Sequence, residues 1–373
     1  MPRPLMVLEG EVFSELSLSR VNRELALALL RRDDLDLAIS APEIGSYLTM
    51  PSAAIDRLRA RVGVALDRPP DLVLHHSWPP DFRRPAYGRY AHIQPYELGE
   101  LPREWVEALR GNADEIWCYG SFVADMYRRA GFAEEKITIV PPGVDPQVFR
   151  PDGPRAQLDT RKSFRFLFLG GTIWRKGIDL TLNAFLSAFG PDDDVTLVIK
   201  DVGGNSVYRG QNAKEIIAPL MRRPDLAEIV YTDATFDDAM LAALYRSVDV
   251  VLAPYRGEGF GMPVLEAMAC GTPSIVPAGG ATDDFVDDSV GLRIPANRID
   301  VVAPNLPDLM GPGWALEIPP ERLVQVLRAI AGKRDALAQL GAAGAARAHG
   351  DWTWDRTAAL VAERVRNAAA LVS

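Results

Sequence analysis

A glycine-rich turn between an apolar run and a helix is the stretch of this sequence best suited to bind an anion. Residues 257–261 read Gly-Glu-Gly-Phe-Gly, and a helix is expected to begin at Pro263. Glycines let the backbone approach a ligand closely, and the first N–H groups of a helix have no partner within it. The alternative is a plain tight turn, which the same glycines would also allow.

Two glutamates, Glu258 and Glu266, lie on either side of the expected helix start. Carboxylates accept hydrogen bonds from hydroxyls and do not bind phosphates. A carboxylate on each side of a phosphate-binding turn therefore favours a ligand with hydroxyls at both ends of a diphosphate, as in a nucleotide sugar. Taken singly, either glutamate is better explained as part of a solvated surface.

Two cations, Arg175 and Lys176, precede a second expected helix that begins near Ile178. Cations at a helix N-terminus oppose the macrodipole, so their placement favours an external anion such as a diphosphate leaving group. A charged helix start without a ligand is the alternative. The pair could take the place of a metal ion, and no Asp-x-Asp motif occurs at an expected strand end. We therefore expect neither a metal nor another cofactor.

The composition is that of an ordinary globular protein. The chain has 373 residues, of which 48% are hydrophobic and 24% charged, and its net charge of −9 argues against general nucleic-acid binding. Cys118 and Cys270 form neither a metal pattern nor a disulfide framework, which fits a reducing compartment. Too few apolar residues precede Glu9 for a signal peptide. We expect a cytoplasmic protein; the composition allows peripheral attachment to the inner face of a membrane and leaves the oligomeric state open.

Strand and helix patterns alternate twice along the chain, on either side of a segment rich in Pro, Gly, Asp and Arg over residues 141–161. This length and pattern predict an α/β fold with two Rossmann-like, doubly wound parallel-sheet domains that face a central cleft. The predicted domains are residues 1–150 and 151–350. The last helix, within residues 351–373, is expected to pack back on the first domain.

Several polar residues of the first domain follow expected strands, where ligands gather in such sheets. Three loops are expected to share one rim: residues 10–17, 75–84 and 94–102. Gly10 begins the first loop, His92 ends an expected strand, and Gln94 follows it. A lone histidine is more often a satisfied structural residue than a functional one. Ser121 is expected to cap a helix that runs to about Arg129.

Read together, Glu258–Glu266 and Arg175–Gly177 resemble the donor site of the retaining glycosyltransferases of family 4, which have the GT-B fold. Pro141–Asp145 and Leu244–Val250 resemble that family's linker and its helix-to-strand pattern. Residues 19–25 and 93–99 resemble a subgroup of uncharacterised bacterial enzymes, often linked to the glycosylation of cell-surface glycans or proteins. The resemblance covers most of the second domain and, loosely, the whole chain.

The resemblance implies a role for each residue of the donor site. Glu258 would hold hydroxyls of the donor sugar and Glu266 those of the ribose, while Arg175 and Lys176 would neutralise the departing diphosphate. The glycines of the rim and the backbone amides of the turn would contact the donor: Gly10, Gly170, Gly171, Gly259, Phe260, Gly261 and Met262.

Two features depart from the family's pattern or leave it open. The family usually has an arginine directly after the first strand of the second domain, where this chain has Gly170 and Gly171, so Arg175 is the one arginine that the sequence places nearby. The family also often has a histidine of the first domain near the reacting carbon, and His92 and Gln94 compete for that position.

The predicted function is a glycosyltransferase that moves a hexose from a UDP- or GDP-linked sugar to a glycan, lipid-linked or protein acceptor. Retention and independence of metal are part of this expectation. One alternative is a nucleotide-sugar sensor or an inactive binding module. Another is an epimerase or phosphorylase with the same fold. Residues 299–314 show little periodicity and are expected to form an excursion loop.

Overall fold

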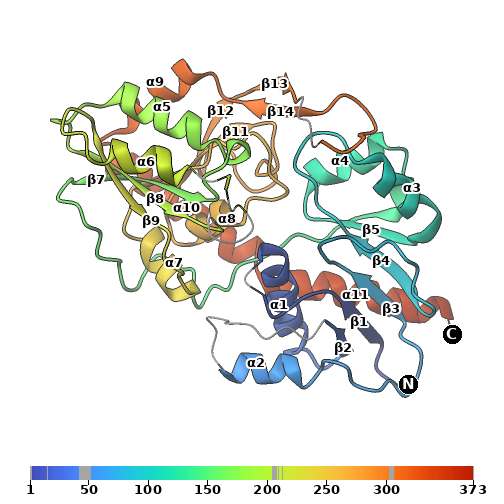
Figure 1. Cartoon of the computed structure of the whole chain (residues 1–373). Helices are drawn as coiled ribbons and strands as arrows, with labels where there is room; N and C mark the ends of the chain where they lie inside the picture. The colour runs from blue at the N-terminus through green and yellow to red at the C-terminus, as the bar shows by residue number, and fades with distance from the viewer. Residues whose placement is uncertain are drawn as a thin grey trace.

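The computed structural model shows two α/β domains side by side, with the C-terminal helix lying along the first domain (Figure 1). It describes residues 2–14, 16–41, 52–203, 208, 210–211, 213–301 and 306–372. The first domain contains, in chain order, β1 (Leu5–Glu9), α1 (Ser17–Leu29), β2 (Asp36–Ser40), α2 (Ser52–Arg59), β3 (Leu72–His75), β4 (Arg89–Ile93), α3 (Arg103–Asn112), β5 (Glu115–Cys118), α4 (Ser121–Arg129), η1 (Glu134–Lys136) and β6 (Ile137–Ile139).

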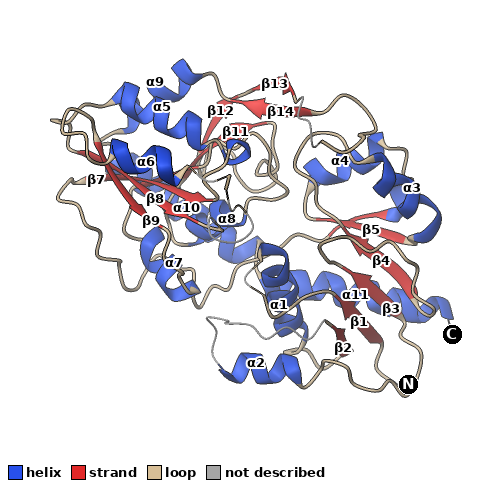
Figure 2. Ribbon diagram, in the orientation of Figure 1, coloured by secondary structure: helices blue, strands red, loops and turns tan. Residues whose placement is uncertain are grey.

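The first sheet is parallel and has the strand order β2-β1-β3-β4-β5-β6. Helices cover both of its faces (Figure 2), so β3 and β5 are buried along their whole length. The direction in which strands are added reverses between β1 and β3. The loops after these two strands therefore open at the switch point of the sheet, where ligands bind in such folds.

The second domain repeats the doubly wound plan with a different strand order. Its elements are β7 (Phe164–Gly170), η2 (Trp174–Lys176), α5 (Ile178–Ala188), β8 (Val195–Asp201), α6 (Lys214–Leu220), β9 (Glu228–Thr232), α7 (Asp238–Tyr245), β10 (Val250–Leu252), α8 (Met262–Ala269), β11 (Ser274–Ala278), β12 (Leu292–Pro295), β13 (Asn297–Asp300), β14 (Trp314–Glu317), α9 (Pro320–Ile330), α10 (Arg334–Asp351) and α11 (Trp354–Val372). The main sheet is parallel, with order β12-β11-β10-β7-β8-β9, and its switch point lies between β7 and β10.

Aromatic side chains of β7 anchor the core of the second domain. Phe166 is fully buried and packs against Phe185 of α5, with ring centroids 5.8 Å apart. Phe164 lies 5.0 Å from Phe166 by the same measure. Burying side chains of this size contributes about 2–3 kcal/mol each to folding. The strand that leads to the cationic loop is thereby held rigidly.

The predicted excursion loop is in part a small sheet. β13 and β14 pair antiparallel, with Arg298 opposite Leu316 and Asp300 opposite Trp314. The Trp314 ring stacks under the guanidinium of Arg298 at 4.0 Å and contacts Phe122 of the first domain, with ring centroids 5.9 Å apart. These contacts stabilise the β13/β14 pair, which the local sequence pattern does not predict. Residues 302–305 of the predicted loop lie outside the described residues.

The helix after the glycine-rich turn forms as predicted and starts one residue earlier. α8 begins at Met262, after Gly261 with φ +102°, and Pro263 occupies its first turn. Gly271, with φ +76°, follows the helix in the left-handed conformation. No described helix is both long and apolar enough to cross a membrane.

α11 packs on the first domain, mainly against α1 (Figure 1). Arg364 of α11 lies 2.7 Å from Glu115, a buried carboxylate of β5 that also pairs with Arg89 at 2.5 Å. Arg31, which follows α1, pairs with Asp355 of α11 at 2.6 Å. A chain that enters the second domain at β7 is thus tied back to the first domain at its end.

A carboxylate of the second domain caps a helix of the first. Asp284 accepts a hydrogen bond of 2.6 Å from the Ser121 backbone N–H and another from the Ser121 hydroxyl. Ser121 is the first residue of α4 and does not cap it with its own side chain, so the prediction for this residue is wrong. The N-terminus of α4 is satisfied across the domain interface instead.

Candidate functional site

The loops after β7 and β10 meet, because these strands are neighbours in the second sheet. The Arg256 N–H donates to the Arg175 carbonyl at 2.8 Å, and Arg175 Nη1 donates to the Gly257 carbonyl at 2.9 Å. The structure therefore brings together the two separate halves of the predicted anion site, and it places both at the switch point of the sheet.

Lys176 and Glu258 form an ion pair at the centre of this rim. Their side chains are only 18% and 16% exposed. Burial opposes ionisation of Glu258, but the charges of Lys176 and Arg175 more than offset it, and the pKa of the carboxyl lies below its ordinary value. The second oxygen of Glu258 accepts from the Gly259 N–H at 3.2 Å. Glu258 is therefore a fixed, ionised acceptor for hydroxyl groups.

Arg175 reaches the first domain as well as the turn. Its Nη2 lies 3.4 Å from Glu97 and donates to the Tyr208 hydroxyl at 3.3 Å. Burial works against its charge, but Glu97 and Glu258 outweigh this effect and raise the pKa of Arg175. Nη2 makes only these longer contacts, so it is the nitrogen of Arg175 that can turn toward an incoming phosphate at small cost.

A second arginine lies in the same loops, contrary to the prediction that Arg175 is the one arginine nearby. Arg256 is buried and pairs with Asp179 at 2.7 Å and Glu317 at 2.8 Å. It also donates to the Trp174 carbonyl at 2.9 Å and lies over the Trp174 ring. With both carboxylates engaged, Arg256 secures the η2 turn and thereby the position of Lys176.

A side chain at each glycine of the turn would crowd a different neighbour. A Cβ at Gly257 would lie 2.4 Å from the Glu97 carbonyl oxygen, and one at Gly259 would lie 3.1 Å from Pro95. The turn therefore packs closely against a loop of the first domain. The Phe260 side chain is buried against Phe285 and Tyr119, with ring centroids 5.1 and 6.2 Å away. Phe260 is thus an anchor of the turn, and only its backbone faces the predicted ligand site.

β7 ends at Gly170, and Gly171 follows it at the same rim. Gly170 has φ +144° and no heavy atom within 4 Å of an added Cβ, whereas a Cβ at Gly171 would lie 2.5 Å from the Tyr208 ring. Tyr208 therefore covers Gly171 and contacts Arg175. Sequence reasoning missed Tyr208, because its position depends on a loop after β8 with no recognisable pattern.

Glu266 lies in α8 and is only 1% exposed. Its Oε2 accepts from the Tyr245 hydroxyl at 2.9 Å, and Arg20 of the first domain lies 2.8 Å from its Oε1. Burial raises the pKa of Glu266, and the charge of Arg20 opposes the increase. These partners differ from those of Glu258, so the two glutamates serve separate parts of the rim.

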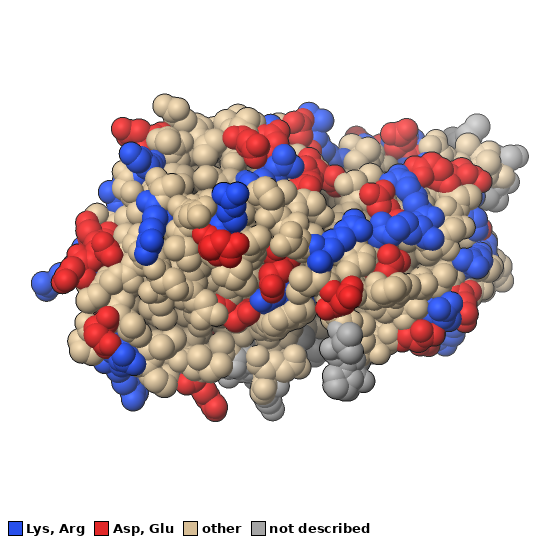
Figure 3. Space-filling model, turned by 90° about the horizontal axis from the view of Figure 1, so that it is seen from above, with Lys and Arg blue, Asp and Glu red and all other residues tan. Residues whose placement is uncertain are grey.

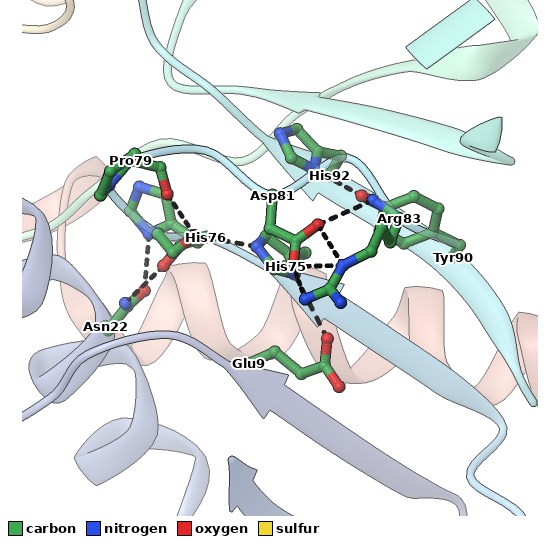
Figure 4. Close-up of polar contacts among 10 residues, drawn as sticks. Glu9, Asn22, His75, His76, Pro79, Asp81, Arg83, Tyr90 and His92 are labelled. Atoms are coloured by element: carbon green, nitrogen blue, oxygen red, sulfur yellow. Dashed lines mark hydrogen bonds and ion pairs between the residues drawn. The ribbon is translucent and has the colours of Figure 1, made fainter. Parts of the chain in front are cut away.

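The switch point of the first domain contains three histidines (Figure 4). His76 Nδ1 lies 2.5 Å from Asn22 Oδ1, and its Nε2 lies 2.8 Å from the Tyr119 hydroxyl. Burial lowers the pKa of His76 to about 3, so it is neutral at neutral pH. A Cβ at Gly10 would lie 2.0 Å from the His76 carbonyl oxygen. Gly10 therefore permits the close approach of the loops after β1 and β3.

The structure gives His92 and Gln94 different environments. His92 lies within β4, fully buried, where it stacks on His75 with ring centroids 5.4 Å apart and its Nδ1 lies 2.8 Å from the Tyr90 hydroxyl. Burial lowers the pKa of His92 well below the usual range. Gln94 follows β4 directly, and its neighbour Pro95 contacts the glycine-rich turn. His92 Nε2 and Gln94 Oε1 are both buried and lack a hydrogen-bond partner among the described residues.

Comparison with known proteins decides the family. The family model described as "Glycosyltransferase Family 4" matches residues 13–148, and the one described as "Glycosyl transferases group 1" matches residues 163–310. The chain belongs to the family 4 glycosyltransferases. Its two domains are the Rossmann-like halves of the GT-B fold.

Relatives of this glycosyltransferase are similar over parts of the sequence and over the whole fold. A D-inositol 3-phosphate glycosyltransferase of Segniliparus rotundus is 30% identical over 228 residues, which are 60% of this chain and 45% of that protein. The chain thus spans about half the length of such relatives. Sucrose-phosphate synthase of Thermosynechococcus elongatus has a TM-score of 0.72 at 19% identity and covers 99% of the chain, with 100% of its own chain covered. Anabaena HepE in complex with UDP-glucose has a TM-score of 0.69 at 15% identity and covers 97% of the chain, with 99% of its own chain covered.

Two charged or polar residues of the rim were missed in the sequence: Arg20 and Tyr208. Glu97 was open as a rim residue, because it lies in a loop that was expected there. Arg20 carries none, since it lies within a predicted helix. Among the described residues of this glycosyltransferase, no group of three or more His, Cys, Asp and Glu side chains is placed to hold a metal ion.

Proposed function

We propose that this glycosyltransferase moves a hexosyl group from a UDP- or GDP-linked sugar to a hydroxyl of a glycan, lipid-linked or protein acceptor. The observation that carries the proposal is the meeting of Arg175 and Lys176 with the Glu258 turn at the β7/β10 switch point. Cations and free helix N–H groups suit the diphosphate, and ionised Glu258 suits the hydroxyls of the sugar. Further support comes from HepE, which has the same fold and has been crystallised in complex with UDP-glucose.

The proposed reaction retains the anomeric configuration and uses no metal. The acceptor oxygen forms its bond to the anomeric carbon on the face from which the diphosphate departs. The bond from that carbon to the phosphate oxygen breaks, and the acceptor proton passes to the departing phosphate. Lys176 and Arg175 stabilise the negative charge that develops on the diphosphate, and the N-terminus of α8 adds to this effect.

The Lys176–Glu258 ion pair is expected to exchange partners when the donor binds. With no donor present the two charges satisfy each other. A diphosphate would attract Lys176, while sugar hydroxyls would donate to Glu258 in its place. Because both groups are already desolvated and fixed, the exchange requires little reorganisation.

The test is a turnover assay with UDP- and GDP-linked hexoses, in which released nucleoside diphosphate is measured with and without EDTA. The proposal expects slow hydrolysis without an acceptor, faster release when a hydroxyl acceptor is added, no effect of EDTA, and a product with the donor's anomeric configuration by proton NMR. Tight binding without any turnover would indicate a sensor and overturn the proposal. Strict dependence on a metal, or inversion, would overturn the corresponding part.

A further inference from the structure

Arg20 crosses the domain interface. It lies on α1 of the first domain, yet its guanidinium contacts two carboxylates of the second: Nη1 is 2.8 Å from Glu266 Oε1, and Nη2 is 2.9 Å from Asp238 Oδ1. Its guanidinium carbon lies 5.7 Å from the centre of the Phe149 ring. Its side chain is 22% exposed, whereas that of Glu266 is 2% exposed. The deeper partner is therefore the carboxylate of the second domain.

One oxygen of Glu266 has acceptor capacity beyond its contact with Arg20. Oε2 accepts from Tyr245, but Oε1 is buried and has no donor in hydrogen-bonding geometry among the described residues, although Arg20 Nη1 is close to it. A carboxylate has about four acceptor positions on its two oxygens. A small cavity is lined by Glu266 and by residues of both domains, among them Val144 and Met262. A hydroxyl group in that cavity would satisfy Oε1.

The charge of Glu266 depends on its neighbours. Burial raises the pKa of this carboxyl, the charge of Arg20 lowers it, and the charge of Asp238 raises it further. The remaining groups that face the pair are Tyr245 on α7, Glu24 beside Arg20 on α1, and Cys270, which follows α8. Tyr245 and Cys270 are buried with raised pKa values, so both are neutral in the range where enzymes are assayed. Arg20 is thus the cation whose charge favours the ionised form of Glu266.

We propose that Arg20 is a positioning residue that holds Glu266 ionised and oriented to accept hydrogen bonds from the ribose hydroxyls of the donor. The first domain then takes part in recognition of a donor that is held by the second. This inference rests on the proposed function, because it requires a nucleoside diphosphate as ligand. If the ion pair only joined the domains, substitution of Arg20 would not change how strongly binding depends on the ribose hydroxyls.

The experiment measures the affinity of UDP and GDP and of their 2′-deoxy and 3′-deoxy forms by calorimetry. In the wild type, loss of the hydroxyl that contacts Glu266 is expected to weaken binding about tenfold or more, as for hydrogen bonds to charged groups. In Arg20→Ala this loss is expected to shrink to about two- to threefold, because Glu266 no longer provides a charged acceptor. Arg20→Lys, which keeps the charge, should restore part of the difference.

A second measurement uses two variants that shift the pKa of Glu266 in opposite directions. Arg20→Ala removes the charge that lowers the pKa of Glu266, so binding of the ribose form should weaken as the pH falls from 8 to 6. Asp238→Asn removes a charge that raises this pKa, so its binding should resist acidification better than that of the wild type. A purely structural ion pair would give both variants the same direction of change.

The outcomes distinguish a failure of the proposed function from a failure of the role of Arg20. If the wild type binds none of the nucleotides, the proposed function fails. If the wild type binds UDP or GDP and Arg20→Ala shows the same penalty for a deoxyribose, the role of Arg20 is refuted while the donor site stands. Thermal unfolding at pH 8 checks that the variants are folded, and equal pH profiles of Arg20→Ala and Asp238→Asn would also refute the proposal.

Discussion

The two switch points of this molecule differ in the charge of their central side chains. The rim of the second domain carries the ion pair of Lys176 and Glu258, with Arg175 beside it. The rim of the first domain carries His76 and His92, which burial keeps neutral. Glu9, Asp81 and Arg83 lie around these histidines, so the first rim has buried neutral imidazoles among ionisable side chains, whereas the second rim has an ion pair at its centre. The difference fits a donor diphosphate held by the second domain and an uncharged hydroxyl acceptor offered by the first.

Charged groups do gather elsewhere, but without a single sign. On the face seen from above, Lys and Arg side chains are interspersed with Asp and Glu side chains (Figure 3). Exposed pairs of this kind contribute little to stability, typically about 0–1 kcal/mol. The largely enclosed pair at the second rim is different, because its side chains are only 18% and 16% exposed and removal of one partner leaves an uncompensated charge.

The largest expected effect comes from breaking the charged rim. Lys176→Ala or Glu258→Gln should lower kcat by on the order of 10²–10³, as for loss of one preorganised charge-stabilising group. The matched control is Lys162→Ala, just before β7 at the end remote from η2, where the ammonium donates to the carbonyls of Pro191 and Asp193. Steady-state rates of nucleotide release measure both. Full activity of a folded Lys176→Ala variant would contradict the claim that this rim binds the diphosphate.

Acid should lower the folding stability of the first domain through His76. The native state keeps His76 neutral down to a pKa of about 3, while the unfolded chain binds a proton below about 6.5. Stability from this site is therefore complete above pH 6.5 and falls as the pH drops, by about 2 kcal/mol at pH 5. Hydrogen exchange at pH 7 and 5 should show the first domain losing protection ahead of the second.

His76→Gln provides the control for that experiment. It removes one titrating imidazole, so the fall in protection between pH 7 and 5 should become shallower even if the variant is less stable at pH 7. An unchanged slope would mean that His76 is not buried in its neutral form.

Smaller effects on activity and stability should show whether Gln94 or His92 lies near the reacting carbon. Gln94 follows β4, beside the loop that contacts the glycine-rich turn, whereas His92 is enclosed within the strand. Gln94→Ala is expected to lower kcat/KM about tenfold with little change in the melting temperature. His92→Gln is expected to lower the melting temperature more than kcat/KM, because it breaks the buried contact with Tyr90. The reverse pattern would assign the reacting carbon to His92.

The smallest effect concerns the cap between the domains. Asp284→Ala removes the acceptor at the N-terminus of α4, which should cost about 1 kcal/mol of stability. Chemical denaturation measures it, and Asp283→Ala is the neighbouring control because its carboxylate accepts from Gly279 within its own domain. Equal losses in both variants would show that the cap does not tie the domains together.

Much of the second rim was predictable from sequence. Arg175 and Glu258 each follow an apolar strand pattern, and the doubly wound order makes those strands neighbours, so local signals suffice to place them together. Gly261 and Gly271 likewise reveal the limits of α8 through their own backbone preferences.

The contacts between the domains could not be predicted in this way. Arg20 reaches Glu266, Asp284 caps α4, and Trp314 packs on Phe122 only because of how the two domains are oriented. No local pattern carries that orientation. The pairing of β13 with β14 was missed for a related reason, since contacts with the first domain help to hold it.

The central claim is that the β7/β10 rim holds the donor through its diphosphate. The most direct test compares the affinities of UDP and GDP with those of UMP and GMP, in the wild type and in Lys176→Met, by calorimetry. The account predicts that the wild type binds a diphosphate at least about tenfold more tightly than its monophosphate, as expected for a charge-assisted contact, and that most of this difference disappears in Lys176→Met. An equal preference for the diphosphate in the folded variant would contradict it.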